Sequence, residues 1–517
     1  MNLATESWIP VLHKSGEHRL VSLRQVFLEG EEYTDLAVRT HERIALMRLL
    51  VCIAQAALDG PKDITEREKV PDLLPKAVDE YLHQGYFKLF DAKRPFLQIP
   101  DLETAGEPTP VSKLDFSLAT GNATTLFDHG ANQEGDRLFA PAKMALMLLT
   151  YLNFSPGGLI AQVNWGNQKT TKSSDDAPCI PSSMYHSFIR KENIRDTIYA
   201  NFLTKMTVKH FYGNDKWGRP VWENAPESFS DNEAITNATA TYLGRLVPLP
   251  RFVLLNPSGQ TMILANGFKY PGLNIWPREP SATIVVVKVK EKDERKVLGA
   301  GNREIWRELP ALIVKRKTDD LGGALTLMNV PEKEGFDLYV GALIRKQADI
   351  LEAVESVYHV PSSLQTEHGR MVYESETKFA EGIASRLYWA VETYFRHLSD
   401  DWSEKIKREP DPRKRGALRK QFVAKSTNHY WTAVEKLRLL LMAYVDAIGG
   451  DADTVDKGKD TWRSAVHSAA RDAYCLACGQ ETPRQMRAFA LGWDRLFVQH
   501  TENEASDEPD AEVNEQE

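Results

Sequence analysis

The sequence predicts an α+β protein in which a large mixed α/β domain precedes a C-terminal four-helix bundle. Residues 1–365 mix helical and strand-like patterns, whereas residues 366–500 show helical periodicity throughout. The change follows Pro361-Ser362-Ser363, residue types that commonly interrupt regular structure. We therefore expect a domain over residues 1–365, a bundle over 366–500 and a disordered acidic tail over 501–517.

The first domain has start and stop signals for two helices. An apolar helix is expected from His41 to Leu58, because Gly60-Pro61 ends it, and a second begins at Pro141 and stops at Ser155. Four apolar or β-branched runs are typical of strands, and a Pro-Ser-Gly turn joins the first two into a hairpin. These runs are Arg251–Leu255, Gln260–Ala265, Thr283–Val289 and Ala311–Val314.

Four segments of the C-terminal part each carry one apolar stripe at helical spacing. The stripes span residues 379–398, 434–448, 462–476 and 486–496. The last one follows Thr482-Pro483, a capping residue and a proline at the first helical position. One apolar face per helix is what a four-helix bundle buries in its core.

The composition is that of a globular protein. Of 517 residues, 42% are hydrophobic and 26% are charged, and no run of eighteen apolar residues occurs. The first residues lack the basic and apolar regions of a secretory signal, so we expect a cytoplasmic protein without membrane contact. Cys475 and Cys478 have metal-like spacing but no second ligand pair nearby, which favours core packing over a metal site. We expect neither a metal nor another cofactor.

The net charge of −8 originates in the C-terminal tail. Residues 501–517 contain eight acidic residues and no basic one, which leaves 64 acidic and 64 basic residues in the rest of the chain. Within that neutral body, Lys405–Lys425 carries nine basic and two acidic residues. We expect this segment to connect the first two bundle helices, either as a track for single-stranded nucleic acid or as a solvated loop. Its clustered bases include Arg413, Lys414, Arg415, Arg419 and Lys420.

The most unusual stretch is the polar triplet Arg345-Lys346-Gln347. It follows the apolar run Leu338–Ile344 and precedes a segment with a helix-like pattern. Two cations beside an amide suit contact with a phosphate backbone and a base edge. From the residues alone, solvated side chains at the start of a helix are the favoured interpretation.

Motifs of the common catalytic classes are missing from the sequence. There is no Walker sequence, no dinucleotide-binding glycine pattern, no His-Glu-x-x-His and no Gly-x-Ser-x-Gly. We therefore expect a protein without enzymatic activity. The alternative is an unrecognised nucleic-acid-processing enzyme whose active site is assembled from distant residues.

Five segments carry a family resemblance. They are Trp8-Ile9-Pro10-Val11, Leu49–Gln55, Arg94–Gln98, Thr120–Phe127 and Gly341–Leu351. In this order they resemble the CasA family, the large subunit of the type I-E CRISPR surveillance complex called Cascade. The resemblance runs from residue 2 to about residue 498. It implies a non-catalytic subunit with a mixed domain followed by a bundle.

The resemblance also implies an activity and partners. Such a subunit recognises a protospacer-adjacent motif in double-stranded DNA, opens the duplex so that guide RNA pairs with it, and holds the displaced strand. It contacts other Cascade subunits and recruits a helicase-nuclease. A subunit that serves mainly as a structural scaffold of the complex is the alternative.

Individual DNA-binding residues are implied by the same resemblance. Gln347, flanked by Arg345 and Lys346, matches the family's glutamine wedge, which enters the base stack. Gly157-Gly158 matches the glycine loop that lies against the minor groove, because glycine permits close approach of the backbone. By sequence alone, this glycine pair also fits a turn at a helix end.

Two further expectations concern a lysine and a loop. The family places a lysine in the minor groove, and Lys269 is our candidate, with Lys288 as the alternative. Phe127-Asp128-His129 matches the family's loop at the 5′ end of the guide RNA and at neighbouring subunits. An ordinary surface loop is the other interpretation of those three residues.

Overall fold

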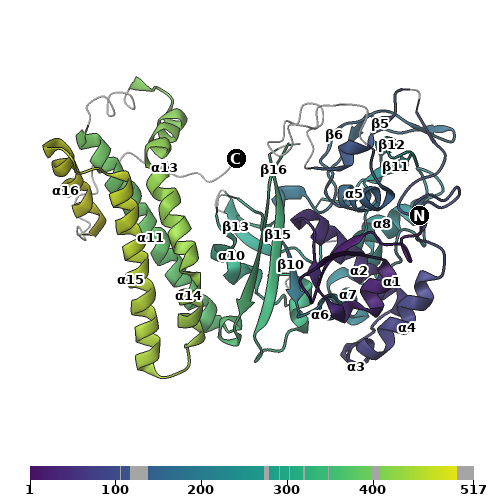
Figure 1. Ribbon diagram of the computed structural model, residues 1–517, viewed down its shortest axis with the longest axis horizontal. Helices are drawn as coiled ribbons and strands as arrows, with labels where there is room; N and C mark the ends of the chain where they lie inside the picture. The colour runs from purple at the N-terminus through teal and green to yellow at the C-terminus, as the bar shows by residue number, and fades with distance from the viewer. Residues whose placement is uncertain are drawn as a thin grey trace. The chain divides into compact units, whose positions relative to one another are not determined.

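The computed structural model describes residues 1–104, 106–116, 138–272, 279–289, 292–301, 303–317, 321–346, 349–398 and 408–497. The chain divides into two compact units, Met1–Val360 and Pro361–Glu517 (Figure 1). The first unit mixes helices with small sheets, and the second is helical in all its described elements. The predicted α+β class is thus confirmed.

The strands of the first unit form small antiparallel sheets. One has the order β2-β1-β3, from β1 (Ile9–His13), β2 (His18–Val21) and β3 (Tyr33–Leu36). The predicted hairpin is confirmed as β11 (Arg251–Leu255) and β12 (Thr261–Asn266), with β5 (Thr109–Pro110) on its edge. The predicted strand near residue 284 is β13 (Ile284–Val289), paired with β14 (Lys292–Val297). Short ladders join β4 (Leu102–Glu103), β7 (Asn164–Trp165) and β8 (Gln168–Lys169), and join β6 (Gly158–Leu159) to β9 (Ser173–Ser174).

Both helices predicted for the first unit are present. They are α2 (Thr40–Leu58), which is apolar around most of its circumference and therefore buried, and α5 (Pro141–Phe154), which has proline at its first position. The other helices of this unit are α1 (Leu23–Leu28), α3 (Ile64–Glu68), α4 (Val70–Leu82), α6 (Ile194–Ala200), α7 (Lys205–Tyr212), α8 (Asn232–Ala240), α9 (Tyr242–Leu246) and α10 (Ile305–Leu312).

The strand expected at Ala311–Val314 is wrong. These residues include the end of α10, in which Trp306, Leu309 and Leu312 recur at helical spacing and are buried. A four-residue apolar run fits a strand or a buried helix equally well, and the residues before it decide between them.

Two arginines and one glutamate form an ion cluster inside the first unit. Glu279 Oε2 lies 2.6 Å from the Nη1 atom of Arg48, and its Oε1 atom lies 2.7 Å from Arg245 Nη2. All three side chains are almost completely buried. Burial alone would raise the pKa of Glu279, but the two guanidinium groups outweigh it and the pKa is lowered. The cluster therefore remains ionised and ties α2 to α9 and to the segment before β13.

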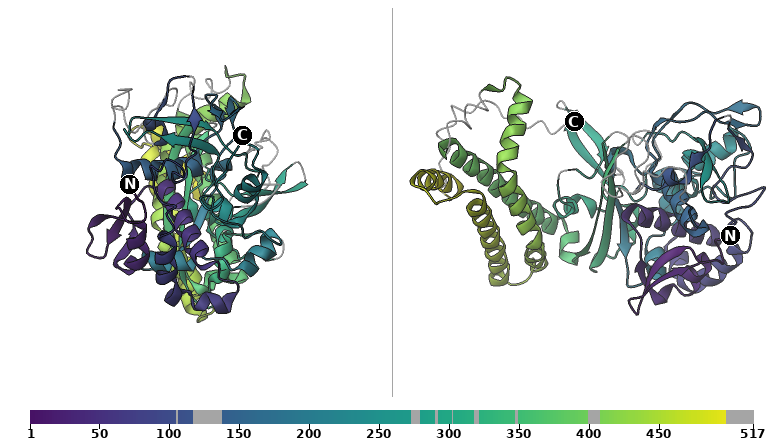
Figure 2. Two further views of the ribbon diagram at one scale, coloured as in Figure 1. Left: turned by 90° about the vertical axis from the view of Figure 1, so that its right-hand side faces the viewer. Right: turned by 45° about the horizontal axis from the view of Figure 1, so that its top comes forward.

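A long hairpin forms the last part of the first unit. β15 (Phe336–Lys346) pairs with β16 (Asp349–Val360) over its whole length, and with β10 (His186–Arg190) only from Asp337 to Gly341. Figures 1 and 2 show β15 and β16 as a pair of long arrows. The helix-like segment expected after residue 347 is therefore wrong. From Val354 to Val360 the side chains alternate between inner and exposed positions, which is the period of a strand.

Helices make up most of the described part of the second unit. They are α11 (Glu367–Leu398), α13 (Pro412–Lys436), α14 (Arg438–Asp446), α15 (Ala452–Ala477) and α16 (Pro483–Phe497). The second predicted stripe is divided at Leu437 between α13 and α14. The expectation that the basic segment is a loop is wrong from residue 412 onward, because those residues belong to α13. Asp411 caps this helix and Pro412 occupies its first turn.

Polar anchors support the apolar core of the second unit. The Tyr430 hydroxyl donates to the carbonyl oxygen of Ala380 at 2.8 Å. Arg463 on α15 donates to both carboxylate oxygens of the buried Glu376 on α11. α16 packs closely on α11 because Gly492 has no side chain: a Cβ there would lie 2.6 Å from the carbonyl oxygen of Ala390.

Candidate nucleic-acid interface

Asp175 and Asp176, here called the acidic pair, lie where three expected DNA-binding residues meet. The backbone amide of Gly157 donates to Asp176 Oδ1 at 2.7 Å. The guanidinium of Arg345 donates from Nη1 to the same oxygen at 2.7 Å and from Nη2 to Oδ2. The ammonium of Lys269 lies 3.3 Å from Asp175 Oδ1. Residues far apart in the sequence are thus gathered at one carboxylate pair.

The glycine loop, residues 155–160, follows α5 directly. Ser155, rather than either glycine, is the C-terminal capping residue of α5. A Cβ on Gly157 would lie only 2.8 Å from the carbonyl oxygen of Ser174, and Gly158 has a φ of 154°. Close approach therefore demands glycine at position 157, and backbone conformation demands it at position 158.

Hydrogen bonds hold the glycine loop on two sides. Gly158 pairs with Ser174 in the β6–β9 ladder, and the Ser174 hydroxyl donates to the Gly158 carbonyl oxygen at 3.2 Å. The buried Arg251, at the start of β11, donates from Nη2 to the carbonyl oxygens of Pro156 and Asp175, both at 2.8 Å. The loop is thus fixed before any ligand binds.

Arg345 is held by its backbone as well as its side chain. Its amide donates to the Ser183 hydroxyl at 3.1 Å, and its side chain is only 17% exposed. Ser182 and Ser183 have φ values of 55° and 48°, a left-handed conformation that side chains disfavour. Such local strain often occurs at functional sites. Arg345 therefore faces the acidic pair, whereas the neighbouring Lys346 is exposed.

Lys269 lies beside the segment that contains the acidic pair. The side-chain amide of Asn266, the last residue of β12, donates to the Thr171 hydroxyl at 2.8 Å and so joins the end of this strand to the segment before the acidic pair. The Lys269 side chain remains 77% exposed, so its cation is accessible from solvent. Lys288, the alternative, is an exposed residue of β13.

The charge of Asp176 follows from its contacts. Partial burial would raise the pKa of this carboxyl, but hydrogen bonds from Arg345 and from the Gly157 amide more than compensate, and the pKa is lowered. Asp176 is therefore ionised at neutral pH and carries a full negative charge between the loop and the hairpin.

Several predicted site residues lie outside the described part of the chain. These are Gln347, which would follow the last residue of β15, and Phe127, Asp128 and His129, together with the acidic tail. For them the predictions from the sequence stand untested.

A group of charges lies just before residues 117–137. Arg39 Nη1 is 2.8 Å from Asp115 Oδ1, and Lys143 Nζ is 3.3 Å from Asp115 Oδ2 and 3.5 Å from Glu42 Oε1. Beside them, His41 is buried, and its ring nitrogens have no hydrogen-bond partner in the described part of the chain. Burial, and then the cation of Arg39, lower the pKa of His41 to about 4, so this imidazole is neutral.

The predicted basic residues of the second unit lie on α13. Arg413, Lys414 and Lys420 are exposed, whereas Arg415 is partly buried. Arg419 is also partly buried, and its Nε atom is 3.5 Å from the Glu392 carboxylate, so part of its charge is compensated within the bundle.

The described residues contain no cluster of histidine, cysteine or acidic side chains that would hold a metal ion. Cys478, the C-cap of α15, is buried, and burial raises the pKa of its thiol to about 12, whereas Cys475 is exposed. Core packing therefore describes Cys478 but not Cys475. None of the described helices is long and apolar enough to cross a membrane.

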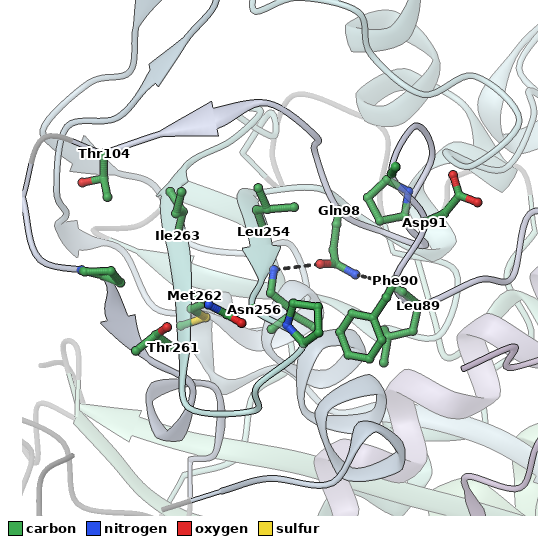
Figure 3. Close-up of a pocket in the computed structure, with 15 residues that line it drawn as sticks. Leu89, Phe90, Asp91, Gln98, Thr104, Leu254, Asn256, Thr261, Met262 and Ile263 are labelled. Atoms are coloured by element: carbon green, nitrogen blue, oxygen red, sulfur yellow. Dashed lines mark hydrogen bonds between the residues drawn. The ribbon is translucent and has the colours of Figure 1, made fainter. Parts of the chain in front are cut away.

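A pocket of about 500 Å³ lies beside the β11–β12 hairpin (Figure 3). Most of its lining is apolar, including Phe90, Leu254 and Ile263. The Gln98 amide on its wall is occupied, because it donates to the Leu89 carbonyl oxygen at 2.7 Å and accepts from the Leu255 amide at 2.8 Å. The pocket therefore offers apolar surface rather than paired catalytic groups.

The sequence reasoning missed the acidic pair and Arg251. Asp175-Asp176 has no motif around it, and its partner Arg345 lies 169 residues away in the sequence. Buried Arg251 was interpreted only as the beginning of a strand. Only the three-dimensional structure shows that these residues connect the glycine loop with the hairpin.

Comparisons with known proteins agree with this architecture. A protein called CRISPR-associated protein CasA/Cse1, from Thermus thermophilus, is 26% identical over an alignment of 502 positions that covers 92% of this chain and 91% of the relative. The crystal structure of a CasA from Thermus thermophilus superposes with a TM-score of 0.72 at 23% identity, over 96% of this chain and 98% of that one. A chain in a structure described as a CRISPR RNA-guided surveillance complex gives 0.71 at 18% identity, over 96% and 99% of the two chains.

These matches place the chain in the class of CRISPR-associated proteins. The family model described as CRISPR-associated protein Cse1 matches residues 2–473, so the chain belongs to the CasA/Cse1 family. This family is the non-catalytic large subunit of type I-E Cascade. The resemblance found in the sequence and the expectation of a protein without enzymatic activity are confirmed.

Proposed function

We propose that this chain reads the protospacer-adjacent motif in duplex DNA through the minor groove and opens the duplex beside it. The observation that carries this proposal is the convergence of Gly157, Arg345 and Lys269 on the acidic pair. A glycine backbone that is free of side chains, next to an exposed cation, suits the narrow and negatively charged minor groove. Recognition of that groove is degenerate, which would let several motif sequences be accepted.

Strand separation is assigned to the end of the β15–β16 hairpin. Gln347 directly follows Lys346, the last residue of β15, and so belongs to the connection between two long paired strands. An amide inserted into the base stack would offset part of the unstacking cost, a few kcal/mol per step, by bonding to exposed base edges. Lys346, which is exposed, is available to a nearby phosphate.

We assign binding of the displaced DNA strand to the exposed basic side chains of α13. Arg413, Lys414 and Lys420 are accessible on this helix, and a backbone track requires clustered cations. Tyr430, further along the same helix, is fully buried and is not available to stack on a base. We expect this binding to be independent of sequence and to weaken steeply with salt.

The remaining partners follow from family membership. The solved relative described as an RNA-guided surveillance complex supports assembly of this chain with other subunits and guide RNA. We assign Phe127, Asp128 and His129 to the guide RNA 5′ end and to neighbouring subunits. Recruitment of a helicase-nuclease after duplex opening completes the proposed role.

The test uses the assembled complex with three variants. Lys269→Ala should weaken binding to motif-containing duplex. It should also reduce the slope of the logarithm of the affinity against the logarithm of the salt concentration by roughly one. Lys288→Ala is the matched control. Gln347→Ala should slow opening of a paired duplex but not binding to a target whose strands are already separated at the motif. If the Lys269→Ala, Lys288→Ala and Gln347→Ala complexes all bind and open duplex like the wild type, recognition is excluded and the scaffold role stands.

A further inference from the structure

Leu159 is the most exposed large apolar side chain in the described part of the chain. It is 92% exposed, whereas the next, Leu439, is 70% exposed. It follows Gly158 directly and lies in the glycine loop. A leucine that is buried would contribute about 1.5–3 kcal/mol to stability, so this residue makes almost none of the contribution available to it.

The exposure of Leu159 is built into a fixed backbone. Leu159 pairs with Ser173 in the β6–β9 ladder, and the next amide, of Ile160, donates to the carbonyl oxygen of Lys172 at 3.1 Å. Ile160 is partly buried and packs against the core. Because successive strand residues face opposite sides, the ladder presents Leu159 to solvent.

The surroundings of Leu159 favour DNA over an apolar protein partner. Lys172, whose carbonyl oxygen accepts from the Ile160 amide of the glycine loop, is exposed, and Lys269 lies against Asp175 two residues beyond Ser173. Lysines around one apolar side chain match the combination of phosphate contacts with an apolar insertion that minor-groove proteins use.

We propose that Leu159 enters the minor groove beside the glycine pair and selects against a G·C pair at the position it meets. The guanine N2 amino group is the donor that distinguishes G·C from A·T on the floor of that groove. An apolar side chain pressed against it would bury the donor without a hydrogen-bond partner, which is costly. This proposal rests on the proposed function and adds a specificity-determining residue to it.

The experiment measures duplex binding by the assembled complex as each motif base pair is varied. The wild type should disfavour G·C at one position and accept inosine·C there, because inosine lacks the N2 amino group. Leu159→Ala should weaken binding to the preferred duplex roughly tenfold and accept G·C and inosine·C equally. Leu159→Asn, whose carbonyl oxygen accepts from the amino group, should favour G·C.

The results separate this inference from the function on which it rests. If Lys269→Ala weakens binding but Leu159→Ala retains the wild-type discrimination, the role of Leu159 is wrong and motif reading stands. If the wild type shows no motif preference, both are wrong. If Leu159→Ala instead impairs incorporation into the complex, measured by size-exclusion chromatography, Leu159 contacts a neighbouring subunit and the proposal is overturned.

Discussion

Replacing Asp176 with asparagine removes one negative charge while keeping the size of the side chain. In the wild type this carboxylate accepts from the Gly157 amide at 2.7 Å and from both terminal nitrogens of Arg345. Asparagine can retain Oδ1, which accepts from the Gly157 amide and from Arg345 Nη1, but its amide nitrogen is a donor and cannot accept from Arg345 Nη2 as Oδ2 does. The variant thus tests whether one carboxylate joins the glycine loop to the hairpin.

The expected loss of stability is about 2 kcal/mol. Hydrogen bonds to a charged partner contribute about 1.5–3 kcal/mol when protected from water. The Arg345 and Asp176 side chains are 17% and 30% exposed, which places the pair between a surface and a buried salt bridge. Asp175→Asn is the matched control. Its carboxylate makes an ion pair with Lys269 that is largely exposed, and its loss should cost less than about 0.5 kcal/mol.

Urea unfolding at pH 7, monitored by fluorescence, measures both variants, and Arg345→Met completes a double-mutant cycle with Asp176→Asn. We expect a coupling of about 1–2 kcal/mol between Asp176 and Arg345. The contribution of Asp176 should be present above the unfolded carboxyl pKa near 4 and disappear as the pH falls below it, because the folded pKa is lowered. Equal costs for Asp175→Asn and Asp176→Asn, or additive single variants, would refute the reasoning.

Two further predictions concern stability. The pKa of His41 is about 4 in the folded chain and near 6.5 when unfolded, so the free energy of unfolding should fall by roughly 3 kcal/mol as the pH drops from 6.5 to 4. His41→Phe should remove this pH dependence, measured by urea unfolding at several pH values. An unchanged pH dependence would contradict the prediction. Gly492→Ala should destabilise the second unit by about 1–3 kcal/mol, because the new methyl would lie 2.6 Å from the Ala390 carbonyl oxygen. Gly382→Ala on α11 is its control: it has open space around it and should be neutral or stabilising, and equal melting temperatures for the two variants would exclude the packing argument.

The sequence predicts an element correctly where a local start, stop or turn signal coincides with a buried apolar pattern. α2 and α5 begin and end within one residue of their predicted limits, because proline, glycine and apolar spacing act locally. The β11–β12 hairpin was predicted for the same reason. The same kind of signal was overlooked at Asp411-Pro412, where high positive charge suggested a loop although capping residues predict a helix.

The sequence does not predict structure that depends on contacts between residues far apart in the chain. The segment from Asp349 to Val360 is a strand because it pairs with β15, and its spacing alone also fits a helix. The acidic pair is important only because folding brings Arg345 and Gly157 to it. Family resemblance supplied the candidate site residues, but not the carboxylates that hold them.

The geometry of the β15–β16 hairpin has a mechanical consequence. β10 supports β15 only as far as Gly341, so the part from Ala342 to Lys346 is a ribbon of two strands, roughly 17 Å long at strand spacing. Ala342 and Leu343 are buried, so the deflection of the ribbon is greatest at its end, where Arg345 bonds to Asp176 and Ser183. These ties set how far the end deflects under load. A force that DNA exerts on the hairpin end would therefore reach the glycine loop through the contacts of Arg345 with Asp176, with little bending of the ribbon.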